Sequence, residues 1–204
     1  MKKINNKKRL LYFAFLSGLL LRMLFLVINA TALAEVFTVN ALFASILQKN
    51  DASGFHMLAV KLSENFIYEN MLYILRFNIY PFFLGVMYFL TINSVIIGNF
   101  ISVFAWCASF IILYKILIKL NFKFETIFIT LLIFSIFPTC IVFTSVTIRE
   151  PYQLLFLTLF VYKIYSYHNS KHIIDLLLII FSFIILSFLH NVFSIALILS
   201  FFLC

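Results

Sequence analysis

Long apolar runs separated by short basic gaps constrain this chain more than any other feature. Residues 10–29 are apolar except at Ser17, Arg22 and Asn29, and a helix of about 20 residues crosses the hydrocarbon core of a bilayer, which is about 30 Å thick. The composition points the same way, because 65% of the 204 residues are hydrophobic and the mean hydropathy is +1.14. A soluble core of this length cannot bury so large an apolar share. The sequence therefore predicts an all-α, polytopic membrane protein.

The apolar runs predict one membrane domain over residues 1–204 with about five to six transmembrane helices. The first run has a rival interpretation as a signal peptide, because Ala32 and Ala34 imitate a cleavage site. Its length and the charge of Arg22 favour an uncleaved anchor, and we expect Arg22 either to snorkel or to pair with a neighbouring helix. The predicted boundaries are a tail at 1–9, spans at 10–29, 94–118, 126–146, 152–167 and 172–189, and an incomplete span at 191–204.

Residues 30–93 connect the first two spans and form the predicted outer loop. Apolar side chains recur at helical spacing over residues 39–47 and 55–66. This spacing predicts two juxtamembrane amphipathic helices that lie against the membrane surface or the helix bundle. Residues 79–92 are apolar, but Pro81 interrupts them, and a helix of that length extends only about 21 Å. We therefore predict a juxtamembrane or re-entrant segment there rather than a further span.

The basic residues lie in gaps that a multi-pass topology places on one side of the membrane. Five of the 15 Lys and Arg residues fall within the first nine positions, and others bracket the linkers at 115–123 and 163–171. Because short cytoplasmic loops collect Lys and Arg, the amino terminus is predicted to be cytoplasmic, and residues 30–93 to lie outside. The formal charge of +8 does not form the repeating basic face that nucleic-acid binding requires, so no nucleic-acid partner is predicted.

The candidate site residues are ionisable residues predicted to lie at the outer edge of the membrane. The sequence contains no phosphate-binding glycine loop, zinc-ligand spacing or nucleophile elbow. A carboxylate at Asp51 could act as a general base or bind a divalent cation, although it also fits an Asx turn or a helix cap. Thr147 and Glu150 likewise fit a capping box. The candidates are Asp51, Glu150, Arg149, His56 and His190.

Three segments carry a resemblance to a known family. The first is Asp51-Ala52-Ser53-Gly54-Phe55-His56-Met57-Leu58-Ala59, an acidic residue followed by an aromatic-His pair and Ala. The second runs from Pro81 through Tyr88 to Gly98 and the span that ends at Tyr114-Lys115, and the third from Phe137-Pro138 through Ser145 to Arg149-Glu150. Together they resemble the GT-C class of membrane glycosyltransferases, in particular the bacterial relatives of the protein-mannosyltransferase and aminoarabinose-transferase group.

The resemblance implies inverting transfer of a sugar from a polyprenyl-phosphate donor at the outer face of a bacterial cell membrane. It implies that Asp51 is the catalytic base or a metal ligand and that Glu150 takes the second acidic role. A divalent cation or Arg149 would neutralise the leaving phosphate, and His56 and His190 would bind substrate. The family often has Arg where Leu189-His190-Asn191 stands in this chain.

Two alternatives to an active enzyme stay open at this point. Members of the family are longer, so we expect this chain to be the amino-terminal half of such an enzyme, and a partner chain could supply the missing helices. The alternatives are a non-enzymatic membrane protein, such as a transport or assembly subunit, and a degenerate gene remnant. A transporter usually places polar groups near the middle of the membrane, whereas here the charges gather at the edges, with Arg22 as the exception.

Overall fold

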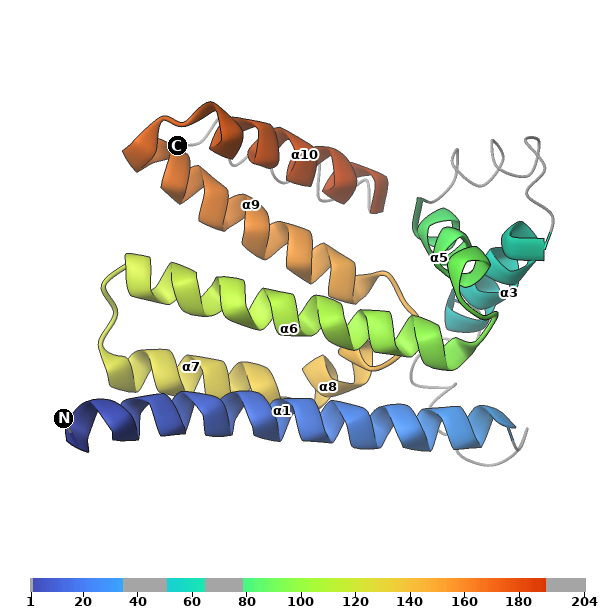
Figure 1. The fold of residues 1–204 in the computed structure, drawn as a ribbon, viewed down its shortest axis with the longest axis horizontal. Helices are drawn as coiled ribbons and strands as arrows, with labels where there is room; N and C mark the ends of the chain where they lie inside the picture. The colour runs from blue at the N-terminus through green and yellow to red at the C-terminus, as the bar shows by residue number, and fades with distance from the viewer. Residues whose placement is uncertain (1, 35–50, 65–78, 190–204) are drawn as a thin grey trace.

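The computed structural model describes residues 2–34, 51–64 and 79–189, and every regular element within these ranges is an α-helix (Figure 1). The all-helical prediction is therefore confirmed for this part of the chain. The helices are α1 (Lys2–Ala34), α3 (Asp51–Glu64), α5 (Ile79–Leu90), α6 (Val95–Lys119), α7 (Phe124–Ile136), α8 (Pro138–Thr144), α9 (Glu150–Ser170) and α10 (Ile173–Leu189).

Two of the described helices are long and apolar enough to cross a membrane. They are the Asn6–Ile28 part of α1, with 23 residues, and α6, with 25 residues. The pair α7 and α8 makes a third candidate if the two helices form one broken span. Helix α10 has 17 residues and extends about 25 Å, somewhat less than a hydrocarbon core. The structure thus supports a membrane protein with two to three candidate spans, and the larger predicted number stays a prediction.

The predicted span 126–146 is not one straight helix. Helices α7 and α8 meet at a bend of 58°, because Pro138 has no backbone N–H and its ring disfavours a helical conformation at Phe137. A break of this kind leaves carbonyl groups near the end of α7 without their usual helical donors. In an apolar environment these groups need other partners.

Arg22 of α1 supplies those partners. Its guanidinium donates from Nη1 to the carbonyl of Ser135 at 2.8 Å and lies 3.5 Å, through Nη2, from the carbonyl of Phe134. Nε donates to Thr144 Oγ1 on α8 at 2.7 Å. The side chain is fully buried, so Arg22 pairs with neighbouring helices and does not snorkel.

The surroundings of Arg22 are closely packed. The guanidinium carbon lies 3.7 Å from the centre of the Trp106 ring on α6, a cation–π distance. A Cβ atom added at Gly18, one helical turn before Arg22, would lie 2.8 Å from Ser135 Cβ and 2.9 Å from Trp106 Cη2. Gly18 therefore lets α1 approach α6 and α7 closely enough for Arg22 to reach the break.

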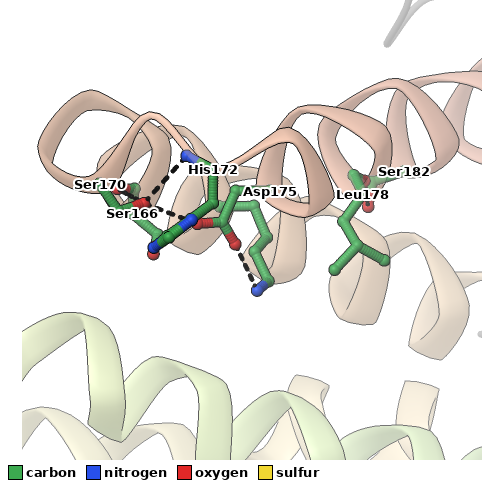
Figure 2. A network of polar contacts seen from close by, with 7 residues as sticks. Ser166, Ser170, His172, Asp175, Leu178 and Ser182 are labelled. Atoms are coloured by element: carbon green, nitrogen blue, oxygen red, sulfur yellow. Dashed lines mark hydrogen bonds and ion pairs between the residues drawn. The ribbon is translucent and has the colours of Figure 1, made fainter.

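Helices α9 and α10 form an antiparallel pair joined by a tight turn. Lys171 ends α9 in the left-handed conformation, with φ of 54°. Asp175 in the first turn of α10 accepts a hydrogen bond from Lys163 Nζ at 2.7 Å and another from Ser170 Oγ at 3.0 Å (Figure 2). The carboxylate thus ties the end of α9 to the start of α10.

Helices α3 and α5 form a pair of short helices beside the start of α6 (Figure 1). A Cβ atom added at Gly85 would lie 2.9 Å from Leu62 Cβ and 3.2 Å from the carbonyl oxygen of Ala59, so the two helices touch through small residues. Helix α3 covers most of the segment 55–66, where a surface helix was predicted, but Met57 and Leu58 are exposed alongside the buried Ala59 and Leu62. That this helix lies on a membrane surface stays a prediction. The other predicted helix, at 39–47, lies outside the described residues.

The helices place the basic residues at one end of the bundle. Figure 1 shows the start of α1, the turn from α6 to α7 and the turn from α9 to α10 on the same side, with α3, α5 and the start of α6 on the other. We call the first the basic end and define it by residues 2–9, 115–125 and 162–175. The grouping agrees with the predicted topology, whereas the side of the membrane that each end faces stays a prediction.

Candidate functional site

Three tyrosines lie at the centre of the region opposite the basic end. Tyr80 and Tyr88 lie on α5, two turns apart, and Tyr152 lies in the first turn of α9. All three are almost inaccessible to solvent, and the rings of Tyr80 and Tyr152 are 5.3 Å apart. We call these three residues the tyrosine cluster. Helices distant in sequence therefore meet around phenol groups in an apolar setting, where hydroxyl groups need partners.

A chain of polar contacts runs from α3 to α6 through the tyrosine cluster. His56 Nδ1 on α3 and Tyr88 Oη on α5 are 2.9 Å apart. Burial raises the pKa of Tyr88, and a hydrogen bond with Thr147 acts in the opposite direction. The Thr147 hydroxyl in turn contacts Asn99 Oδ1 on α6 at 2.7 Å. Four separate segments thus contribute one polar side chain each.

Gly98 makes room for this chain of contacts. A Cβ atom added there would lie 2.7 Å from Thr147 Oγ1 and 3.0 Å from Tyr88 Oη. Both distances are shorter than an ordinary van der Waals contact between carbon and oxygen. Glycine at this position therefore lets α6 pass close to both hydroxyl groups. The position corresponds to the glycine that carries part of the family resemblance.

Arg149 and Glu150 lie beside the tyrosine cluster at the start of α9. Arg149 Nε is 3.8 Å from Glu150 Oε1, and Arg149 Nη1 lies 3.5 Å from the carbonyl of Leu189 at the end of α10. Burial raises the pKa of Tyr80, and its neighbours Tyr152, Tyr88 and Glu150 act in the same direction. The Glu150 carboxylate is thus close enough to the cluster to act on a phenol there.

The predicted capping box at the start of α9 is wrong. The residue before the helix is Arg149, and no side chain caps it. Thr147 instead turns its hydroxyl toward Asn99 and toward the carbonyl of Val95, 3.4 Å away. The tertiary contact replaces the local one because the buried hydroxyl of Thr147 finds a hydrogen-bond partner in the side-chain amide of Asn99 on α6. Glu150 is therefore not held by a cap.

Several polar atoms near the tyrosine cluster are buried without a hydrogen-bond partner among the described residues. They are Asn99 Nδ2, Arg149 Nε and Gln153 Nε2. Exchanging the amide oxygen and nitrogen of Asn99 does not remove the deficit, because Thr147 can satisfy only one of the two atoms. Buried polar groups are usually bonded to protein or water. The region therefore presents mainly hydrogen-bond donors that a water molecule or an oxygen-rich ligand would satisfy.

Burial also acts on His56. It lowers the pKa of the imidazole, because a half-buried ring loses hydration that the charged form needs. His56 is thus neutral at pH 7, and its contact with Tyr88 is a hydrogen bond between two uncharged groups. A neutral imidazole next to a phenol can accept or relay a proton.

The structure brings three of the five predicted site residues to the same region. His56 contacts Tyr88 of the tyrosine cluster, and Arg149 and Glu150 begin the helical turn that carries Tyr152. Asp51 is the first residue of α3, but its side chain lies outside the described part, and so does His190. Among the described residues no group of three or more His, Cys, Asp or Glu side chains could hold a metal ion. The predicted cation therefore stays a prediction.

Sequence reasoning missed the uncharged members of this region. Asn99 and Gln153 lie in or beside apolar runs and belong to no motif, and Tyr88 and Thr147 were noted only as part of longer patterns and not as candidate site residues. A usable signal existed, since Asn99 is a polar residue inside a predicted span, and such residues are rare unless they pair or serve a site.

Comparisons of this chain with models of protein families, with curated proteins and with solved structures found no match.

Proposed function

We propose that this chain is a multi-pass membrane protein that transfers a sugar from a polyprenyl-phosphate donor, or forms part of an enzyme that does so. One observation carries the proposal: α3, α5, α6 and α9 bring His56, Arg149 and Glu150 together around buried donors at the end opposite the basic residues. An edge site of this kind suits a substrate whose lipid tail stays in the bilayer.

In the proposed reaction Asp51 removes the proton from an acceptor hydroxyl as that hydroxyl attacks the anomeric carbon of the sugar. The bond from the anomeric carbon to the phosphate oxygen breaks, and the lipid phosphate leaves with its negative charge. Arg149, whose Nε forms no hydrogen bond with a described residue, is suited to neutralise this charge. Glu150 takes the second acidic role, alone or with a divalent cation.

The position of Arg22 bears on the alternative of a transport subunit. A buried arginine in a candidate span is the feature that most favours a conduction path. However, all three guanidinium nitrogens lie within 3.5 Å of oxygens of the protein. Arg22 thus satisfies oxygen atoms at the break between α7 and α8. This structural role favours an enzyme site at the membrane edge over a conduction path through the spans.

The test is transfer activity in membranes that contain the Asp51→Asn variant. We expect this variant to lose transfer from a lipid-linked sugar at unchanged expression, because an amide cannot accept the proton. Glu64→Gln is the matched control, since Glu64 is exposed at the other end of α3, and it should keep full activity. Equal activity in both variants would exclude Asp51 from the reaction. Loss of glycolipid on deletion of the gene gives an independent readout.

Topology is tested separately. Single cysteines placed at positions 50 and 120 should react with impermeant reagents from opposite sides, and a reporter fused after Ile148 should lie outside the cytoplasm. A cytoplasmic reporter would place the start of α9 on the wrong side for a lipid-linked donor and would refute the proposal.

A further inference from the structure

The basic end carries most of the charge of the protein. It holds ten of the 15 Lys and Arg residues but only two of the seven acidic residues, Glu125 and Asp175. The strongest internal ion pair of this end joins Asp175 to Lys163 (Figure 2). Lys115, Lys119 and Lys123 form no ion pair with any described residue. Their charge is therefore available to a partner.

Aromatic rings fix several of these ammonium groups in place. Lys119 Nζ lies 4.3 Å from the centre of the Tyr162 ring and 6.0 Å from that of Tyr165. The Tyr165 hydroxyl donates a hydrogen bond to the carbonyl of Lys119 at 2.9 Å. Lys7 and Lys171 lie 4.9 Å and 5.3 Å from the rings of Phe124 and Tyr167. An ammonium group over a ring keeps its charge and loses part of its freedom.

In a bilayer crossed by α1 and α6, the same residues would lie at the level where the bilayer meets water. Helices α1 and α6, the two candidate spans, both have an end here. Tyrosine is enriched at this level because its ring is apolar and its hydroxyl is polar, and lysine stems lie along the apolar surface. A surface with fixed ammonium groups at the depth of lipid phosphates complements a negatively charged headgroup.

We propose that the face formed by Lys115, Lys119 and Lys123 together with Tyr162 and Tyr165 binds the headgroup of an anionic phospholipid. Lys115 and Lys119 lie one turn apart on α6, so both face the same side. Lys123 follows the turn in which Asn121 adopts a φ of 56°, which returns the chain toward the same level. The phosphate lies between the ammonium groups while the acyl chains stay in the bilayer.

The test measures the preference of the reconstituted full chain for a spin-labelled anionic lipid. The probes are phosphatidylglycerol and phosphatidylcholine with the same labelled acyl chain, in phosphatidylcholine vesicles. Wild type should retain phosphatidylglycerol preferentially, and each Lys→Gln substitution at 115, 119 or 123 should weaken this preference about fivefold. Added salt should reduce it, because screening weakens exposed charge pairs.

Two matched controls make the result specific. Lys61→Gln removes the same charge from α3, at the other end of the bundle, and should leave the preference unchanged. Tyr162→Leu should weaken the preference at unchanged net charge, because Lys119 loses the nearer of its two rings. An equal effect of Lys61→Gln, no preference in wild type, or displacement of the lipid by inorganic phosphate would each overturn the proposal.

The inference rests on insertion of the chain into a bilayer but not on sugar transfer. Resistance of the reconstituted protein to alkaline extraction checks insertion first. If the inserted protein shows no preference for the anionic lipid, only the headgroup site is refuted. If that protein still transfers sugar, the proposed transfer activity stands.

Discussion

The surroundings of Arg22 and the tyrosine cluster are both polar regions inside an apolar protein, but they differ in how their polar atoms are satisfied. Arg22 finds oxygen partners on α1, α7 and α8 for all three guanidinium nitrogens. Near the tyrosine cluster, Asn99 and Gln153 keep buried atoms without partners among the described residues. Satisfied polar groups stabilise a fold, whereas unsatisfied ones cost stability and are retained where a ligand completes them.

Two polar atoms next to Arg22 differ from the guanidinium in how they are satisfied. Trp106 Nε1 and Ser135 Oγ, both next to Arg22, also lack hydrogen-bond partners within the described part of the chain. However, the ring of Trp106 is occupied by the guanidinium, and the neighbourhood of Gly18 leaves no room for an added atom. Close packing excludes a ligand there. The charged group at the centre is satisfied, and we therefore assign Arg22 a structural role.

The largest expected effect is that of Arg22→Ala. The substitution leaves the carbonyls of Ser135 and Phe134 and the Thr144 hydroxyl without their charged donor, which costs about 3 kcal/mol or more of folding free energy. We expect a marked fall in the thermal unfolding midpoint of the purified protein in detergent. Arg9→Ala, an exposed position on the same helix, is the control and should have little effect. A similar midpoint for both variants would contradict the structural role.

Gly98→Ala should have the next largest effect, because the added methyl group would contact Thr147 and Tyr88 at distances that force them apart. Overpacking of this kind costs about 2 kcal/mol. Gly54→Ala is the matched control, since a Cβ atom there meets nothing within 4 Å and alanine favours helix. Thermal unfolding of both variants, with transfer activity as a second readout, tests the close approach of α6. Unchanged stability of Gly98→Ala would show that α6 does not pack closely against Thr147 and Tyr88.

The sequence predicted the long helices well and the contacts between them poorly. The span predicted at 94–118 corresponds to α6, because a long apolar run with a serine cap at its start has few other solutions. The sequence predicted one span over 126–146, although Pro138 lies within it, and nothing nearby indicated that Arg22 satisfies the break between α7 and α8. The two residues are more than 100 positions apart, and only the packing of α1 against α7 joins them.

In the candidate site, too, the sequence indicated individual residues but not the contacts between helices. His56, Arg149 and Glu150 were found as charged or titratable residues near predicted membrane edges. Tyr88 and Asn99 were not, because their roles depend on the contact between α3 and α5 and on the absence of a side chain at Gly98. Local chemistry identifies charged candidates, whereas uncharged partners emerge only from the tertiary arrangement.

Gln153→Met separates ligand binding from stability in the tyrosine cluster. The amide nitrogen of Gln153 is buried and has no hydrogen-bond partner in residues 2–34, 51–64 and 79–189. An apolar side chain of similar size should therefore leave stability unchanged or raise it by up to about 1 kcal/mol. If the donors serve a ligand, the same variant should lose transfer activity. The measurement pairs an unfolding midpoint with an activity assay on one preparation. Destabilisation by Gln153→Met would mean that the amide has a protein or water partner, and the contrast with Arg22 would disappear.

The smallest expected effect concerns pH and His56. Its pKa in the folded protein is lowered from 6.5 by burial, so between these two values the unfolded chain binds a proton that the folded chain does not. Stability should therefore be unaffected by His56 above pH 6.5 and should fall as the pH decreases below it. The His56→Gln variant keeps a polar group opposite Tyr88 but does not titrate, and its unfolding midpoint should fall less than that of wild type between pH 7 and about pH 5. Parallel pH profiles for the two proteins would show that α3 does not hold His56 against α5 in a neutral state, and the proton relay through Tyr88 would lose its first member.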